Sequence, residues 1–310
     1  MAPDDKGSAH PNLSRAAGEA HTEGEVFMRD AIEKRRLEFA FEPPMVPTAW
    51  YGGNEHRTAF LSALSLVFPE GERFFVDSVR RYKDRIEDPD LRSAVEAFIG
   101  QEAAHGKEHR AFNALLRDRD YPVAAQEEED LRELLGRAKT TLPARSRLAV
   151  TCALEHFTAI LAEQLLGDEA LPSSFHPSVR GLWVWHALEE TEHKAVAFDV
   201  YVAIGGGYLR RAAMMATTTA IFLSRIFRIH IAFLRSRGKA LELRGWLSLA
   251  NFLFGWGPGL FRRALPAYLA YYRPGFHPDE RDTHALLARW RSALFGAEGE
   301  LRPWVRADAA

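Results

Sequence analysis

Apolar residues recur along the middle of the chain at the three- and four-residue spacing of one helix face. The spacing continues on both sides of Pro69, where a proline inside the pattern predicts a local kink. Asp88 before Pro89 is typical of a helix start, and Gly205 to Gly207 form a stop signal. Long helices are expected over residues 55–86, 89–116, 143–166 and 178–204. Four such helices predict an all-α fold built on a four-helix bundle.

The two ends of the chain differ from this middle part. Residues 1–45 begin as a polar tail without the apolar core of a secretory signal and continue as a short arm that runs into prolines. Residues 117–141 contain an acidic run and are expected to form a solvated connection. The expected units are a tail and arm over 1–45, a bundle over 46–205 and a C-terminal helical extension over 206–310.

The C-terminal extension is rich in apolar and aromatic residues. Residues 208–234 carry arginines mainly on one side of a helical wheel, and residues 246–272 are interrupted by glycines and a proline. The longest uncharged run, Ala212 to Ser224, is shorter than the ~18 residues that a membrane span needs. Three interpretations stay open for these helices: packing on the bundle, contact with a membrane interface, and a lid over an apolar substrate channel.

Composition excludes several classes of protein. The formal net charge of −2 argues against a nucleic-acid-binding protein, which usually carries a basic excess. Cys152 is the only cysteine, so an internal disulfide framework and a cysteine-based zinc site are excluded. A reducing cytoplasm is the expected location, with membrane association as the alternative. A monomer and a homodimer are both compatible with the sequence.

The stretch from Trp183 to Tyr201 carries the strongest chemical signal. Its residues His186, Glu190 and His193 stand at i, i+4 and i+7, which places three metal-ligand side chains on one narrow helix face. One face cannot complete a metal site, so the other predicted helices should supply matching groups.

The other predicted helices do carry such groups, in a recognisable order. Along the chain the candidates are Glu72, then Glu102 with His105, then Glu155, then Glu190 with His193. This order matches the ligand pattern of ferritin-like di-iron and di-manganese carboxylate bundles. Burying these carboxylates among apolar neighbours would cost several kcal/mol each without a partner, and two divalent ions would balance four negative charges. The pattern therefore predicts a dinuclear metal site inside a ferritin-like bundle.

Several further residues lie close to this pattern. His186 lies one turn before Glu190, as either an additional ligand or a core histidine. His109 is expected to support a ligand or to contact substrate. Cys152 and Thr158 lie within a turn of Glu155 and either line the cavity or act as small packing residues. His156 is expected to pack or to form a hydrogen bond. Glu189 and Glu192 are expected to be solvated or paired with Lys194 or another neighbour.

Two resemblances support these assignments. From about Trp50 to Asp282 the chain resembles a bacterial family of predicted metal-dependent hydrolases, through FPEGERFF, FIGQEAAHGKEHRAFN, ALEHFTA, WHALEETEHKAVAFDVY and PGFHPDERD. The spacing His-x-x-x-Glu-x-x-His is similar to the last ligand helix of the di-iron aminobenzoate N-oxygenases, which add a third histidine to the ferritin-like set. By that likeness the ligands would be Glu72, Glu102, His105, Glu155, His186, Glu190 and His193.

Two enzymatic activities follow from this site. The ligand set favours a non-haem di-iron oxygenase or oxidase that uses O2 to oxidise a small apolar or aromatic substrate, with a ferredoxin or reductase as electron donor. The alternative is a di-metal hydrolase, with manganese or zinc lowering the pKa of a water. The hydrolase would need a non-ligand carboxylate as general base, and the sequence offers no convincing one. Iron storage is a third class, but the long apolar extension favours an enzyme with a substrate pocket.

Overall fold

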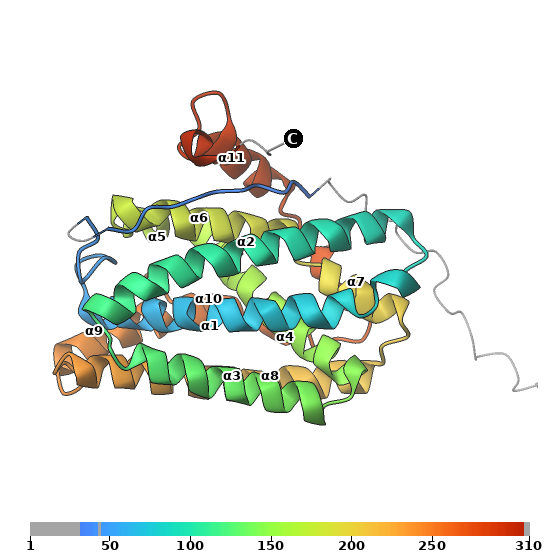
Figure 1. The fold of residues 1–310 in the computed structure, drawn as a ribbon, viewed down its shortest axis with the longest axis horizontal. Helices are drawn as coiled ribbons and strands as arrows, with labels where there is room; N and C mark the ends of the chain where they lie inside the picture. Colours follow the sequence, from blue (N-terminus) through green and yellow to red (C-terminus); the bar gives the residue numbers. More distant parts are fainter. Residues whose placement is uncertain (1–31, 43–44, 307–310) are drawn as a thin grey trace, which may run out of the picture.

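The computed structural model describes residues 32–42 and 45–306, and these residues form the all-α fold that the sequence predicts. Four helices make up the bundle around the interior. They are α1 (Glu55–Arg80), α2 (Pro89–Arg119), α4 (Ala144–Gly167) and α6 (Pro177–Glu192). Figure 1 shows three of them running lengthwise and the fourth, α4, passing behind α1. No β-strand occurs in the described ranges, which contain only the isolated bridges Leu37–Val305 and Tyr51–Phe175.

The helix starts follow local sequence signals. The side chain of Asn54 accepts a hydrogen bond from Arg57 N at the start of α1, and Asp88 caps α2 before Pro89 as predicted. α1 continues through Pro69 to Arg80, and a short 3₁₀ turn at Lys83–Arg85 follows it. These helix starts determine which residues of each helix face the interior of the bundle.

The fourth predicted helix is not continuous. α6 ends at Glu192, and α7 (Val196–Ala203) begins after a turn. The turn lets two successive residues reach buried partners: His193 Nε2 lies 3.1 Å from Glu102, and Lys194 Nζ lies 3.5 Å from Glu163. An unbroken helix would separate these adjacent side chains by about 100°. Gly205, with a φ of 73°, then ends the segment where the glycine run predicted a stop.

The connection after α2 is more regular than we expected. Residues 124–141 form α3 (Ala124–Thr141), which packs against α1 and α8. Leu131 is buried on its inner face, and Leu134 and Leu135 line a cavity beside the bundle. The acidic run therefore lies in the first turns of an amphipathic helix and not in a solvated loop, and its Glu127 is buried and paired with Arg225 of α8.

The C-terminal helices cover the bundle on two sides. α8 (Tyr208–Ser236) packs on α1 and α4, and α9 (Leu243–Phe254) and α10 (Leu260–Ala270) pack on α1 and α4 respectively. Of the helices in the described ranges, α8 alone is long and apolar enough to cross a membrane, and one third of its most apolar window is buried in the protein. α11 (His284–Phe295) packs on α6, and the one-turn α5 (Ala170–Ser173) precedes α6.

The described part of the N-terminal arm is extended and lies along the bundle next to α11 (Figure 1). Leu37 is buried and pairs with Val305 near the other end of the chain. Arg35 is also buried, and its guanidinium group contacts α6. The arm therefore completes the wall of the bundle. The tail over residues 1–31 lies outside the described residues.

Candidate metal centre

Four bundle helices direct acidic and imidazole side chains toward one interior region. The set comprises Glu72 from α1, Glu102 and His105 from α2, Glu155 from α4, and His186, Glu190 and His193 from α6 and its C-cap. Each of these side chains is buried, with no residue more than 4% exposed. The structure thus brings together every residue that the sequence pattern proposed as a ligand.

The potential ligand atoms form two neighbouring groups, and within each group they lie within 4.8 Å of one another. One group is Glu72, His105 and His186, and the other is Glu102, Glu190 and His193. Glu190 links the two groups, because its Oε1 lies 3.0 Å from Nε2 of His186 and 3.7 Å from Nε2 of His193. Glu155 extends the second group, with Oε2 placed 3.4 Å from Nε2 of His193.

Many of these buried atoms have no hydrogen-bond partner. Both carboxylate oxygens of Glu72, Glu102 and Glu155 lack one, as do Nδ1 of His105 and Nε2 of His193. The Nε2 of His193 lies 3.1 Å from Glu102 and 3.4 Å from Glu155, but not in hydrogen-bond geometry. Buried polar atoms in proteins are almost always satisfied, because leaving one unpaired costs about 1–3 kcal/mol, and more for a charged group. A cluster of unsatisfied oxygens and ring nitrogens facing each other is the arrangement that bound cations would satisfy.

Hydrogen bonds fix the ring of His186 with one nitrogen toward the cluster. Ser65 Oγ donates to Asn113 Oδ1 at 2.7 Å, so Ser65 must accept from Nδ1 of His109 at 2.8 Å. His109 is then left with an accepting Nε2, which receives a proton from Nδ1 of His186 at 2.7 Å. This chain leaves Nε2 of His186 directed toward the cluster, 3.6 Å from Glu72 Oε1 and within hydrogen-bond distance of Glu190 Oε1 at 3.0 Å.

The outer nitrogen of His105 is held in the same way. Its Nε2 donates to Glu189 Oε2 at 3.0 Å, and Glu189 Oε1 accepts from the buried Arg35 at 3.1 Å. The unpaired Nδ1 of His105 therefore faces the cluster. A carboxylate behind a ligand histidine orients the ring and increases its basicity toward a metal.

His193 completes the pattern through an amide. The Nδ1 of His193 lies 2.9 Å from Gln101 Oε1, and Gln101 Nε2 donates to the backbone of Glu33 and to Glu192. Because both amide donations are used elsewhere, the oxygen of Gln101 must accept from His193. In each of the three histidines one ring nitrogen is thus held from behind and the other faces the interior, where it would supply the lone pair that a metal ligand requires once its proton is displaced.

The electrostatics of the cluster are unfavourable without a cation. Burial, and then the negative charge of Glu102, raise the pKa of Glu155 to about 8. The same two causes raise the pKa of Glu72 well above its usual range. With a pKa of about 8, Glu155 holds its proton at neutral pH, and binding of a divalent ion would displace it. Burial opposes ionisation of Glu102 and Glu190 as well, but contacts with the histidines outweigh it and lower the pKa values of both carboxyl groups.

The surroundings shift the pKa values of the histidines in opposite directions. Burial opposes protonation of His105, but contacts with Glu102 and Glu189 outweigh it and raise the pKa of His105 to about 10. Burial, and then the neighbouring His105, lower the pKa of His186. Carboxylate and imidazole groups without a thiolate suit iron, manganese and zinc, so the residues present fit a dinuclear centre of such metals.

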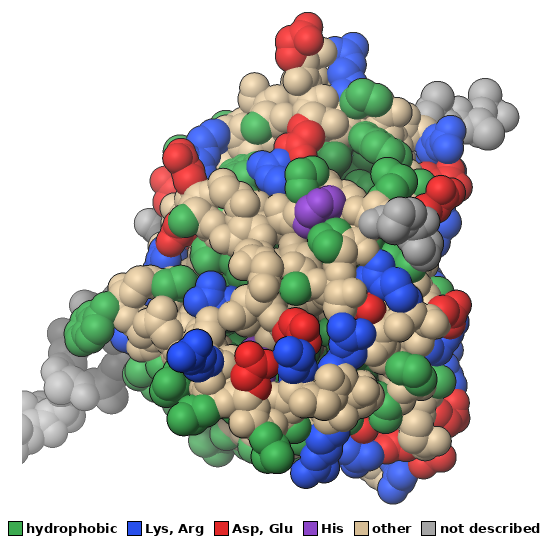
Figure 2. Space-filling model, turned by 90° about the vertical axis from the view of Figure 1, so that its left-hand side faces the viewer, with side chains coloured by type: hydrophobic (Ala, Val, Ile, Leu, Met, Phe, Trp, Pro, Cys, Tyr) green, Lys and Arg blue, Asp and Glu red, His purple; other side chains and the backbone are tan. Residues whose placement is uncertain are grey.

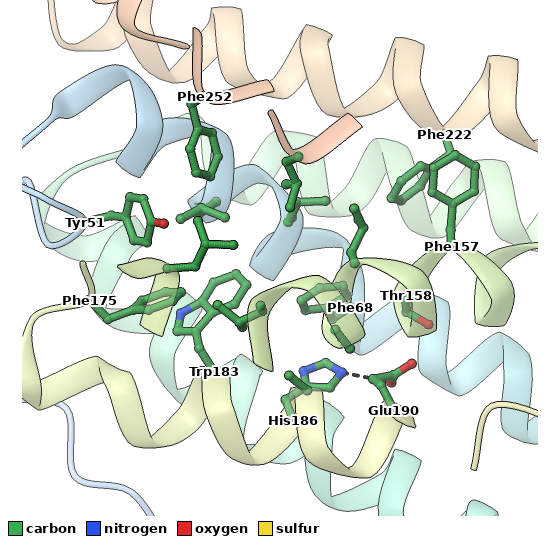
Figure 3. A pocket seen from close by; sticks show the side chains of 18 residues that line it. Tyr51, Phe68, Phe157, Thr158, Phe175, Trp183, His186, Glu190, Phe222 and Phe252 are labelled. Atoms are coloured by element: carbon green, nitrogen blue, oxygen red, sulfur yellow. Dashed lines mark hydrogen bonds and ion pairs between the residues drawn. The ribbon is translucent and has the colours of Figure 1, made fainter. Parts of the chain in front are cut away.

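Two apolar cavities adjoin the cluster. The first, of ≈ 90 Å³, extends from His186 and Glu190 to Tyr51 and Phe252 (Figure 3). The second, of ≈ 220 Å³, reaches Glu72 and is enclosed by α1, α3, α4 and α8. Phe68, Thr158, Glu190 and Phe222 line both cavities. The cluster is thus accessible to a small apolar molecule from two directions.

The residues near the predicted ligands take different positions. Thr158 lines both cavities, whereas Cys152 is absent from both linings and donates to the carbonyl oxygen of Ala197 at 3.2 Å. His109 is buried behind His186 and lines neither cavity. His156 forms a hydrogen bond at 3.0 Å to the carbonyl of Ala267, which is a packing role.

The acidic residues of α6 outside the ligand face are paired with a neighbour, which was one of the expected alternatives, but this neighbour is not Lys194. The enclosed side chains of Glu189 and Glu192 bind Arg35 of the arm, while Lys194 pairs with Glu163. The sequence analysis did not identify Arg35, Gln101, Ser65 or Asn113 as supports of the site. A signal was present for Gln101 and Asn113, because each is a polar residue close to a candidate ligand on one apolar helix.

Comparison with known families gives the class of protein. A family described as predicted metal-dependent hydrolase matches residues 33–282, and this match covers most of the chain. The protein therefore belongs to this family, as the sequence motifs indicated. This description agrees with the hydrolytic alternative better than with the oxygenase that we expected first. Searches among curated proteins and among solved structures find no match.

Proposed function

We propose that the protein is a dinuclear metal-dependent hydrolase that acts on an apolar substrate. One observation carries the proposal: seven buried carboxylate and imidazole side chains converge in two groups, and many of their inner atoms lack a hydrogen-bond partner. The family description supports hydrolysis as the reaction. The metal and the substrate are inferred from the chemistry of the site.

Each group of residues would hold one ion. Glu72, His105 and His186 would hold the first, and Glu102, Glu190 and His193 the second, with Glu155 beside it. A bound pair of divalent ions supplies a water with a pKa near neutrality and a clamp for the oxygens of the bond that breaks. Glu190 lies between the two groups and would be shared by both ions.

The surrounding residues would orient the ligands and exclude bulk water. Gln101, His109 and Glu189 hold the outer ring nitrogens, so the imidazoles cannot rotate away. Phe68 packs edge-on against His186, with ring centroids 4.7 Å apart, and forms part of the apolar wall shared by the site and the cavities. A dry surrounding strengthens every electrostatic interaction at the reacting bond.

The cavity walls indicate the class of substrate. Both linings are apolar except for Thr158, the ligands themselves, and a few threonines and an arginine in the larger cavity. A polar or charged substrate would lose its hydration there without compensation. We therefore infer an ester, amide or similar bond attached to an apolar group.

A second candidate function is oxidation of the same apolar substrate with O2 by a di-iron centre. Two observations favour it. The ligands occur along the chain in the order Glu, Glu-x-x-His, Glu, Glu-x-x-His. In addition, neither cavity lining contains a carboxylate other than the proposed ligands, so hydrolysis would have no separate general base. This reaction would require a reductant such as a ferredoxin.

Metal reconstitution separates the two functions. The full-length protein is stripped with a chelator and reloaded with Mn²⁺, Zn²⁺ or Fe²⁺, and two readouts follow: anaerobic hydrolysis of a series of p-nitrophenyl esters of increasing chain length, and O2 uptake with dithionite-reduced ferredoxin. A hydrolase cleaves esters anaerobically with each active metal. If only the iron-loaded protein is active and O2 is required, the oxidase replaces the hydrolase.

Matched histidine variants control this experiment. His193→Asn removes a proposed ligand and is expected to abolish activity, with the metal content falling below two ions per chain. His230→Asn replaces another fully buried histidine, which packs against Trp246 away from the site. This variant should retain both the activity and the metal content. Equal loss of activity in the two variants would contradict the proposed centre.

A further inference from the structure

The segment from α9 to α10 exposes an unusual number of large apolar side chains. They are Leu243, Leu247, Phe254, Trp256, Leu265 and Leu269. Trp256 is 89% exposed and Leu247 is 61% exposed. Single exposed apolar residues are ordinary, but a group of this size on one short segment marks an interaction surface. We call these six residues the apolar edge.

The apolar edge is the outer side of helices that are apolar on both sides. Leu249, Phe252 and Leu253 of α9 are buried against the bundle, while Leu243 and Leu247 of the same helix face outward. Figure 2 shows hydrophobic side chains gathered on the lower left of this end of the molecule, with lysine and arginine side chains beside them. A helix at a water-exposed surface would carry polar groups on its outer side.

Charge is distributed very unevenly around this surface. Residues 200–278 contain eleven lysines and arginines but one acidic residue, Glu242, in a chain with 40 basic and 42 acidic residues in total. Several of these cations are paired with acids elsewhere in the fold. Two on the segment itself are not: Arg244 is exposed, and Arg262 donates to the carbonyl oxygens of Gly255 and Trp256. The segment thus combines exposed apolar side chains with arginines and has almost no acidic residues.

The inner side of the same segment closes the first cavity. Phe252 of α9 and Leu260 of α10 line the cavity at one end, and His186 and Glu190 line it at the other (Figure 3). Phe254, on the apolar edge, is two residues from Phe252. A molecule that passes between α9 and α10 would therefore move from the apolar edge toward the metal ligands.

We propose that the apolar edge docks onto the interface of an anionic lipid bilayer, and that the first cavity takes its apolar substrate directly from the lipid phase. The exposed leucines, phenylalanine and tryptophan would enter the boundary between headgroups and acyl chains, and the arginines would contact lipid phosphates. The second part of the proposal, substrate entry, rests on the proposed function; the first part does not.

Two observations favour a membrane over a second copy of the chain. A symmetric dimer through this edge would bring a cationic surface against itself, whereas an anionic membrane complements it. The neighbouring helix α8 is also suited to lipid contact, because its uncharged run from Ala212 to Ser224 has its outward residues exposed. Tyr268 of α10 contacts Thr219 in this run through a 3.1 Å hydrogen bond, so the two surfaces adjoin.

Vesicle co-sedimentation tests the docking. The full-length, metal-loaded protein is mixed with vesicles of phosphatidylcholine alone or of phosphatidylcholine with an equal part of phosphatidylglycerol. We expect it to sediment with the anionic vesicles, and added salt should weaken the binding. Leu247→Ser removes one side chain of the edge and should weaken partitioning about tenfold. Arg244→Gln should weaken binding to the anionic vesicles only.

Val202→Ser is the matched control. Val202 is 56% exposed on α7, at the opposite end of the bundle from α9 (Figure 1), so its replacement should leave vesicle binding unchanged. Failure of the wild-type protein to bind either vesicle overturns the docking, as does equal loss of binding in Val202→Ser and Leu247→Ser. A wild-type dimer that Leu247→Ser converts to a monomer would assign the edge to a second copy instead.

Substrate entry is tested separately from hydrolysis. Leu247→Ser should reduce turnover of a long-chain ester embedded in anionic vesicles and leave turnover of a short soluble ester unchanged. Equal activity of variant and wild type on the embedded ester contradicts entry from the membrane. Absence of activity on both esters in the wild type would refute the proposed hydrolase but leave the vesicle-binding result intact.

Discussion

Replacing Glu72 with glutamine should change the stability of the metal-free and metal-loaded protein in opposite directions. Glu72 is fully enclosed among other carboxylates, and neither of its oxygens has a hydrogen-bond partner. Burial and the charge of Glu102 raise the pKa of Glu72 well above its ordinary value of 4.5. The folded metal-free protein therefore keeps this proton to a higher pH than the unfolded chain does.

The size of the effect follows from proton linkage. When folding raises the pKa of a group, its contribution to stability is fully present at pH values below the unfolded pKa. This contribution is lost as the pH rises toward the folded pKa. Each pH unit above the unfolded pKa costs the folded state about 1.4 kcal/mol for as long as the group stays protonated. Glutamine does not titrate, so in the metal-free protein Glu72→Gln avoids this cost. In a chain of 310 residues, about 1.4 kcal/mol corresponds to about 2 °C in Tm.

The metal-loaded protein should respond in the reverse sense. A neutral amide is a poorer ligand than a carboxylate, so Glu72→Gln should weaken metal binding and reduce the stabilisation that added metal provides. Thermal unfolding followed by circular dichroism, with chelator and with Mn²⁺ or Zn²⁺, measures both effects. The gain in the metal-free protein should disappear near pH 4.5.

Glu192 provides the matched control for this prediction. Its side chain is enclosed as well, but Arg35 and Arg291 contact it at 2.8 Å and 2.7 Å. Burial would raise the pKa of Glu192, and its hydrogen bond with Arg35 outweighs burial and lowers it. Glu192→Gln should therefore destabilise the protein with and without metal, by about 3 kcal/mol. If Glu72→Gln lowers the Tm of the metal-free protein as Glu192→Gln does, the reasoning about the unpaired cluster is refuted.

Three further predictions follow from the same contacts. Gln101→Leu removes the acceptor behind His193 and should weaken metal affinity about 10–100-fold, measured by competition with a chromophoric chelator; an unchanged affinity would exclude this orienting role. Arg35→Gln leaves Glu189 and Glu192 buried without their cation and should destabilise the protein by about 3–5 kcal/mol in denaturant unfolding, and a loss below about 1 kcal/mol would show that the arm is dispensable. Leu161→Trp fills part of the first cavity and should raise KM for apolar esters without changing the metal content, whereas an unchanged KM would place the substrate elsewhere.

The fold was predictable where periodicity and stop signals agreed. The start of α2 at Pro89 and the stop at Gly205 were both read from the sequence, as was the convergence of ligand-type residues from four helices. The break after Glu192 was not predictable from local pattern. It depends on partners for His193 and Lys194 that lie on α2 and α4, so tertiary contacts override the helical propensity of that stretch.

The residues that support the ligands were harder to find for the same reason. Glu189 lies on a different helix face from Glu190, and local spacing alone indicates a solvated residue. Its burial depends on Arg35, more than 150 residues away in an extended arm without helical periodicity. Spacing within one helix identifies residues on the metal face, but the residues behind that face come from whichever segments pack there.

The most direct test of the dinuclear centre is a crystal structure of the protein grown with Mn²⁺, with anomalous scattering used to locate the metal. We predict two peaks per chain, one coordinated by Glu72, His105 and His186 and the other by Glu102, Glu190 and His193. A single peak, or peaks bound only to surface carboxylates while the buried groups remain free, would contradict the account.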